Sequence, residues 1–159
     1  MTSPGHDSVV AEVWIDAPPE RIFNALTHQA ELVRWFTDAK SPVHRWEIDA
    51  RPGGSFRYFI DEETAARHGV TAFECHGEIL EFDPPKLLVY TWIASWHADT
   101  ALKTVVRWEI SASGRGTLVR VTHSGLASEP AALRDYGGGW RDQLRMLVSF
   151  VEDKSLSDQ

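Results

Sequence analysis

One segment near the middle of the chain constrains the fold more than any other. Residues 77–92 read G-E-I-L-E-F-D-P-P-K-L-L-V-Y-T-W, two apolar-rich runs separated by the turn Asp83-Pro84-Pro85-Lys86. Two such runs joined by a short Pro-containing turn favour a β-hairpin. Similar turn sequences occur on both sides, at residues 49–56 and 111–116. The central two thirds of the chain is therefore predicted to form one antiparallel sheet.

Alternation of apolar and polar residues predicts seven strands. They are expected at residues 9–16, 45–50, 55–60, 73–82, 87–92, 102–111 and 117–124. Two short helices should follow the first strand: one over residues 20–26, begun by Pro19, and one that ends near Trp35 and is capped by Thr27. Residues 61–72 lack strand alternation and are expected to form a mobile connection, with a helical turn before Gly69.

A long amphipathic helix is predicted to end the chain. Ser128 is the expected N-cap, followed by Glu129-Pro130 in the first turn. The run Gly137-Gly138-Gly139 predicts a kink or a restart, because each Gly inside a helix costs about 1 kcal/mol relative to Ala. The apolar stripe of this helix comprises Trp140, Leu144, Leu147, Val148 and Val151.

Length, charge and cysteine content limit the class of protein. A chain of 159 residues is expected to form a single domain over residues 1–159, with its core at about 9–152. The net charge of −7 argues against a nucleic-acid partner, since phosphate neutralisation supplies much of that affinity. Residues 1–7 do not resemble a signal peptide, and no run is long enough to span a membrane. The lone Cys75 forms no internal disulfide, so we expect a cytoplasmic protein.

The predicted order of strand, two short helices, six strands and a long helix resembles the helix-grip fold of the START or Bet v 1-like superfamily. Within it, the chain is similar to the family named after the activator of the Hsp90 ATPase, over residues 9–152. The segments that carry this resemblance are residues 17–26, 32–36, 49–56, 77–84 with 90–92, 122–126, and Gly139-Trp140 with Leu144 and Leu147. The glycines before Trp140 depart from the family pattern, in which polar helix formers usually stand there.

The resemblance implies an α+β fold with a seven-stranded curved antiparallel sheet, two short helices and a long C-terminal helix over a cavity. It also implies a homodimer in many cases, but no single activity. Some members bind lipids, hormones or polyketides, and some catalyse cyclisation or dehydration. The eukaryotic namesakes bind their chaperone through an additional amino-terminal domain, which we do not expect here, so cochaperone activity does not follow from the family name.

Strand alternation, together with the helix stripe, also predicts which side chains line the space beneath the last helix. The resulting surface is mostly apolar with a few polar groups, as in small-molecule sites. The simpler interpretation is that these rings meet and fill the space. The ten candidate ligand-binding residues are Trp35, Trp46, Phe56, Tyr58, Tyr90, Trp92, Trp108, His123, Trp140 and Leu144.

Few residues suggest catalysis or metal binding. His123 continues the apolar face of its strand, so it is either a ligand contact, a proton shuttle or a core histidine satisfied by a neighbouring acceptor. Cys75 and His76 are adjacent in a strand and point to opposite faces, so they do not form a nucleophile–base pair. Glu74, His76 and Glu78 share one face but lack a second histidine at ligand spacing. No metal or cofactor is expected.

Three hypotheses for function follow. The leading one is a non-catalytic protein that binds a small hydrophobic or aromatic molecule in an internal cavity. The alternative is an enzyme of the polyketide cyclase or dehydratase kind, in which His123 and a Tyr act as acid and base. The third is an interaction module or Hsp90-type cochaperone that uses Trp96, in a polar loop, and the acidic surface. No nucleic-acid or membrane partner is expected in any of the three.

Overall fold

The sheet predicted from the turn sequences is present and dominates the structure. The computed structural model describes residues 7–36 and 45–152, so the prediction about a signal peptide falls largely outside the described residues. The strands are β1 (Val9–Ile15), β2 (Arg45–Ile48), β3 (Ser55–Ile60), β4 (Phe73–Asp83), β5 (Leu87–Ala94), β6 (Thr104–Ser113) and β7 (Gly116–Ser124). The helices are α2 (Pro19–Thr27), α3 (Gln29–Trp35), α4 (Glu62–His68) and α5 (Pro130–Glu152).

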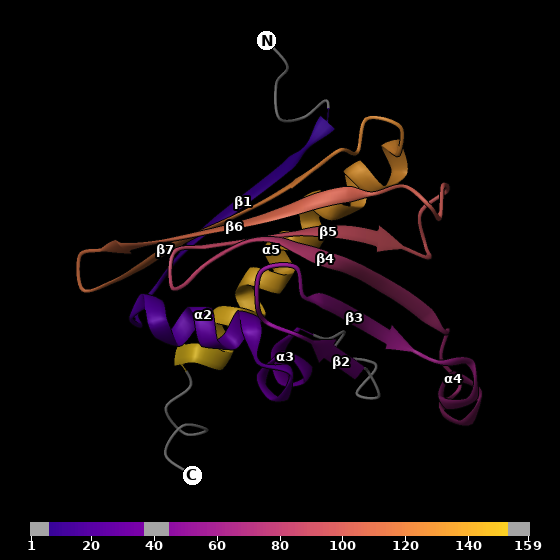
Figure 1. Cartoon of the computed structure of the whole chain (residues 1–159), viewed down its shortest axis with the longest axis horizontal. Coiled ribbons are helices and arrows are strands. Elements are labelled where there is room, and N and C mark those ends of the chain that lie inside the picture. The colour runs from indigo at the N-terminus through magenta and orange to yellow at the C-terminus, as the bar shows by residue number, and fades with distance from the viewer. Residues whose placement is uncertain (1–6, 37–44, 153–159) are drawn as a thin grey trace.

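All seven strands belong to one sheet in the order β1-β7-β6-β5-β4-β3-β2, and every pair is antiparallel. The sheet is curved, with α5 lying across one face and α2 and α3 beside the carboxyl end of α5 (Figure 1). Because α5 lies over the sheet and packs along β1, its buried residues close the core. This arrangement confirms the predicted fold class.

The central hairpin forms where the sequence predicts it. The Lys86 amide donates to the Asp83 carbonyl at 2.8 Å, and the Pro84–Pro85 peptide bond is cis. Near the start of β4, Gly77 packs directly against the neighbouring strand. A Cβ atom at this position would lie 1.8 Å from the Thr91 carbonyl oxygen, so the close approach of β5 requires glycine.

The two short helices are present, but the predicted cap between them is wrong. Thr27 is the last residue of α2, and its hydroxyl donates to the Phe23 carbonyl at 2.8 Å. His28 occupies the cap position of α3 and makes no side-chain capping bond. Thr27 is buried, so its hydroxyl satisfies a backbone carbonyl one turn earlier instead of starting a new helix.

The connection between β3 and β4 contains more than the single helical turn that was expected. Helix α4 covers Glu62–His68, and the Asp61 side chain caps it by accepting from the Thr64 amide at 2.7 Å. This bond lowers the pKa of the Asp61 carboxyl. The helix ends at Gly69, whose φ of 68° is left-handed and favours glycine.

Two predictions about α5 are wrong. Ser128 is not its N-cap, because the helix begins at Pro130 and Ser128 lies in the turn before it. The run Gly137-Gly138-Gly139 causes no restart: the helix is continuous through these residues for 23 residues in all. Trp140, Leu144 and Leu147 are buried as predicted, and at about 2 kcal/mol for each fully buried side chain they anchor the helix.

The longest helices of the described chain are amphipathic rather than uniformly apolar. Among residues 7–36 and 45–152, no helix is both long and apolar enough to cross a lipid bilayer.

Candidate functional site

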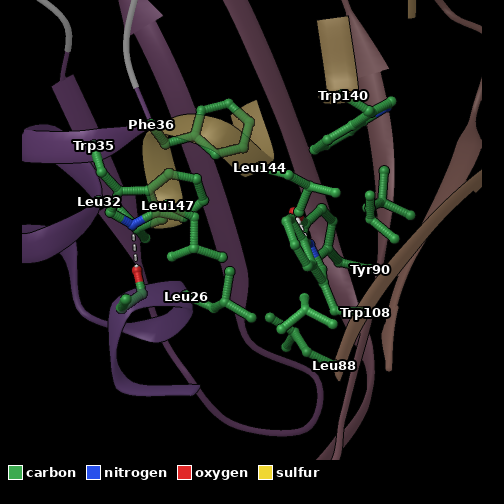
Figure 2. Packing of buried hydrophobic residues seen from close by; sticks show 14 of the residues in the cluster. Leu26, Leu32, Trp35, Phe36, Leu88, Tyr90, Trp108, Trp140, Leu144 and Leu147 are labelled. Atoms are coloured by element: carbon green, nitrogen blue, oxygen red, sulfur yellow. Dashed lines mark hydrogen bonds between the residues drawn. The ribbon is translucent and has the colours of Figure 1, made fainter. Parts of the chain in front are cut away.

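The ten candidate residues come together between the sheet and α5. All are buried, none with more than 7% of its surface exposed. Figure 2 shows how they meet: Trp35 comes from α3, Tyr90 and Trp108 come from the sheet, and Trp140 and Leu144 reach down from α5. The sequence therefore predicted correctly that these side chains are buried, and their role as ligand contacts stays a prediction.

In the structure these side chains contact one another. Phe36, at the end of α3, lies at the centre, with its ring centroid 5.0 Å from that of Trp46, 5.3 Å from that of Tyr58 and 5.9 Å from that of Trp140. These three contacts are edge-to-face, one of the geometries that aromatic pairs prefer. We call this set of rings the aromatic core. The ligand cavity among them stays a prediction.

The buried indole N–H groups of the aromatic core all have acceptors within the protein. Trp108 Nε1 donates to the Tyr90 hydroxyl at 2.9 Å, and Trp35 Nε1 donates to the Ala25 carbonyl at 2.8 Å (Figure 2). Burial raises the pKa of Tyr90 well above its usual value, which keeps the phenol protonated. The Tyr90 oxygen thereby supplies the acceptor that the buried Trp108 N–H requires.

His123 is part of a buried series of hydrogen bonds that runs from Trp140 to the Trp92 carbonyl. Trp140 Nε1 donates to His123 Nδ1 at 3.1 Å, so that nitrogen carries no proton. The ring proton is therefore on Nε2, which donates to Thr104 Oγ1 at 2.8 Å, and the Thr104 hydroxyl donates to the Trp92 carbonyl at 2.9 Å. Burial, and secondarily the charge of His97, lowers the pKa of His123 to about 3. His123 is a neutral core histidine with both nitrogens engaged.

A second polar group, missed by the sequence analysis, lies beside His123. The Tyr136 hydroxyl is within hydrogen-bond distance of Trp92 Nε1, Trp96 Nε1 and His97 Nε2. Tyr136 stands one helical turn before Trp140, so its position was accessible from the helix stripe. The predicted break at the glycines separated Tyr136 from the apolar stripe that begins at Trp140. The loop that carries His97 to Tyr136 has no periodic pattern from which its path could be predicted.

The side chains considered for nucleophilic or metal chemistry lie apart from one another in the described part of the chain. Cys75 is fully buried, which raises the pKa of its thiol, and His76 points to the opposite, exposed face of β4. Glu74 is paired with Arg57 at 2.6 Å on that outer face. Within the described ranges, no three His, Cys, Asp or Glu side chains are grouped so that they would hold a metal ion.

Grooves also lie on the surface of the described structure, and two of them differ in chemical character. One follows the outer face of β2, β3 and β4 and is lined by charged residues that include Glu47, Arg57 and His76. The other lies between α2 and the β4–β5 turn, where Phe23, Phe82 and Pro85 form its apolar part. Both are open to solvent, and the lining of the first also includes Phe56 of the aromatic core.

Comparisons with known proteins identify relatives of this architecture. The family model described as activator of Hsp90 ATPase homolog 1-like protein matches residues 16–152. A crystal structure of protein MLL2253 from Mesorhizobium loti is similar with a TM-score of 0.73 and 25% identity, covering 92% of this chain and 97% of that one. No curated protein sequence gives a significant match.

Two further solved structures share the fold at lower identity. CalU16 from Micromonospora echinospora has a TM-score of 0.67 and 23% identity, covering 94% of this chain and 79% of that one. The Aha1 dimer from Colwellia psychrerythraea, solved in solution, has a TM-score of 0.68 and 19% identity, covering 91% of this chain and 96% of that one.

Proposed function

This chain belongs to the family of activator of Hsp90 ATPase homolog 1-like proteins, and from that premise we propose that it binds a small hydrophobic or aromatic molecule between the sheet and α5. The proposed contacts are the ten residues of the candidate site. They combine a largely apolar surface with a few fixed polar groups, as small-molecule sites do. Because they pack against one another without ligand, binding requires α5 to move away from the sheet.

The observation that carries this proposal is the run Gly137-Gly138-Gly139 inside α5. Alanine would fit at each position, since a Cβ atom there would meet nothing within 4 Å and none of the three glycines has a positive φ. Neither packing nor backbone geometry explains them, although together they cost about 3 kcal/mol relative to alanine. They make one turn of α5, between Tyr136 and Trp140, the easiest place for the helix to deform. Opening at this turn would expose the aromatic core to a ligand.

Thermal unfolding in the presence of candidate ligands tests the proposal. A panel of fatty acids, aromatic polyketides and flavonoids should contain compounds that stabilise the protein, by about 2.7 kcal/mol at 100 times the dissociation constant. The matched control is the chain with all three glycines changed to alanine. It should be more stable without ligand but should bind the same compound more weakly, because the helix no longer opens easily. A panel without any stabilising compound, or equal affinity in the two proteins, contradicts the proposal.

The catalytic alternative is less well supported. It requires His123 and Tyr90, or another core tyrosine, to exchange protons with a polyketide-like substrate. Both His123 nitrogens are already engaged, by Trp140 and Thr104, and the Tyr90 hydroxyl accepts from Trp108. If His123→Ala binds a ligand and turns over every substrate at the wild-type rate, the alternative is eliminated.

A homodimer is a second part of the proposal. Support comes from the Colwellia relative, which was solved as a dimer, and from β1, which is an edge strand with Val10 and Trp14 exposed on its outer face. Light scattering during size exclusion should give twice the mass of one chain. Trp14→Ser should reduce that mass to one chain, whereas Trp96→Ser, at the exposed tryptophan of the β5–β6 loop, should not.

Chaperone binding is tested separately because it would use an outer surface. A pull-down with an Hsp90-type chaperone and an ATPase assay address it directly. We expect no stimulation of the ATPase.

A further inference from the structure

The loop between β5 and β6 is tied to α5 at a single phenol. The Tyr136 hydroxyl oxygen lies 3.0 Å from Trp92 Nε1, 2.9 Å from Trp96 Nε1 and 2.8 Å from His97 Nε2. Trp96 and His97 belong to the loop of residues 95–103, whereas Trp92 belongs to β5. One oxygen atom therefore holds two residues of the loop against the helix.

The number of donors around this oxygen fixes where the protons lie. An indole N–H only donates, so Trp92 and Trp96 occupy the lone pairs of the Tyr136 oxygen. The hydroxyl proton is then directed at His97 Nε2, which must be an unprotonated acceptor. The proton of the neutral His97 ring is therefore on Nδ1, which is buried without a hydrogen-bond partner in a side chain only 4% exposed.

Adding a proton to His97 is incompatible with this arrangement. Protonated Nε2 would direct its hydrogen at a hydroxyl oxygen that already accepts two hydrogen bonds, and both ring nitrogens would then be donors. At least one of the three bonds to Tyr136 must break. We propose that the His97–Tyr136 contact is an acid-sensitive latch: the neutral ring holds loop 95–103 against α5, and protonation of the ring releases the loop.

Several titratable groups face His97 from the surrounding elements. Asp99 lies in the same loop, Glu129 precedes α5, Tyr136 lies on α5 and His123 lies on β7. Burial lowers the pKa of His97, and this outweighs Glu129 and Asp99, which act in the opposite direction. The latch is thus closed at neutral pH and opens at a pH below the ordinary histidine value of about 6.5.

Glu129 provides a second tie that does not depend on His97. Its two carboxylate oxygens accept from the backbone amides of Ala98 and Asp99, each at 2.9 Å. Release of Tyr136 therefore frees Trp96 and His97, whereas the amides of Ala98 and Asp99 stay bound to Glu129. This behaviour belongs to the ligand-free chain, so its test is independent of the proposed ligand.

Nitrogen-15 NMR of the wild-type protein tests the latch directly. At about pH 7.5, His97 should be the Nδ1–H tautomer, with Nε2 as the unprotonated nitrogen. As the pH falls to about 4.5, the indole N–H signals of Trp92 and Trp96 should shift with the same midpoint as the His97 ring. Exchange of the His97 amide, which donates to the Ala94 carbonyl at 3.3 Å, should accelerate over the same range once corrected for its intrinsic pH dependence. Three results would overturn the proposal. They are an Nε2–H tautomer at His97, indole signals that do not change as His97 titrates, and a His97 ring that stays neutral until the whole chain unfolds.

Two variants separate the latch from general acid sensitivity. His97→Gln places an amide oxygen near the position of Nε2 and does not titrate, so the two indole signals should stay in their closed positions at both pH values. Tyr136→Phe removes the shared oxygen, so the His97 amide should exchange rapidly already at neutral pH. An acid shift in His97→Gln equal to that of wild type contradicts the latch. If a variant fails to fold, the tautomer of His97 in the wild-type protein still tests the latch.

Discussion

Two indole N–H groups of the aromatic core find their acceptors on other side chains of the same core. Trp108 donates to Tyr90, and Trp140 donates to His123, in each case between buried residues. Such a core is stable only while both members of each pair are present, since a lone buried donor or acceptor retains its full desolvation cost. Substitutions that remove one polar atom and preserve shape are therefore informative.

Tyr90→Phe removes one hydroxyl and keeps the ring. Trp108 Nε1, in a side chain only 1% exposed, then has no acceptor, so the free energy of unfolding should fall by about 1–3 kcal/mol. Urea denaturation measures this difference. Phe56→Leu, which removes ring atoms without leaving an unpaired donor, is the control for packing alone. No loss of stability in Tyr90→Phe would contradict the assigned bond.

His123 predicts a dependence of stability on pH. The unfolded imidazole binds a proton near pH 6.5, whereas the folded one, with a pKa of about 3, does not. Between these values the unfolded state holds more protons, so the free energy of unfolding falls as the pH falls, by at most about 1.4 kcal/mol per pH unit. Denaturation at about pH 7 and about pH 5 should reveal this decrease. His123→Asn, which retains an acceptor for Trp140, should depend less on pH; an identical dependence in both proteins would contradict the assignment.

At the residue level, the sequence predicted the faces of the side chains but not their partners. Period-two alternation placed Trp46, Tyr90 and His123 inside, because successive strand residues point to opposite faces. The partner of a polar atom depends on loop paths and side-chain rotamers. The His97–Tyr136 contact joins residues 39 apart in the chain. The local sequence pattern around either residue does not predict that it contacts the other.

Two glycines in different elements should respond oppositely to alanine. Gly138 lies in α5 with open space around it, so Gly138→Ala should raise the free energy of unfolding by about 1 kcal/mol. Gly77 lies in β4 against the Thr91 carbonyl, so Gly77→Ala should lower it by at least about 1–3 kcal/mol. Thermal or urea unfolding of the two variants provides the comparison. The same sign for both would mean that the packing around α5 or β4 is described wrongly.

Element boundaries followed from the sequence where turn chemistry dictated them. The Pro84-Pro85 turn and the Gly69 end of α4 both have backbone conformations that only a few residue types adopt. Predictions based on helix propensity alone were less successful. Tertiary packing of Trp140 and Leu144 keeps α5 continuous despite three glycines, and burial of Thr27 overrides its tendency to cap a helix.

For the whole molecule, the order of elements was sufficient to predict the architecture. Seven antiparallel strands and a final amphipathic helix can bury their apolar faces together only if the helix lies across the sheet. The volume of free space beneath α5 could not be predicted from the order of elements, because it depends on how the rings around Phe36 pack. The structure brings those rings into contact, and ligand binding is therefore proposed to accompany movement of α5.

The central claim is that a ligand enters the aromatic core, and the indole N–H signals of the tryptophans test it most directly. With the panel compound that stabilises the protein best, the signals of Trp92, Trp108 and Trp140 should shift on titration. The signal of Trp14, which is exposed on the outer face of β1, should not. Core signals that stay fixed at saturating ligand, or shifts confined to Trp14, would contradict the account.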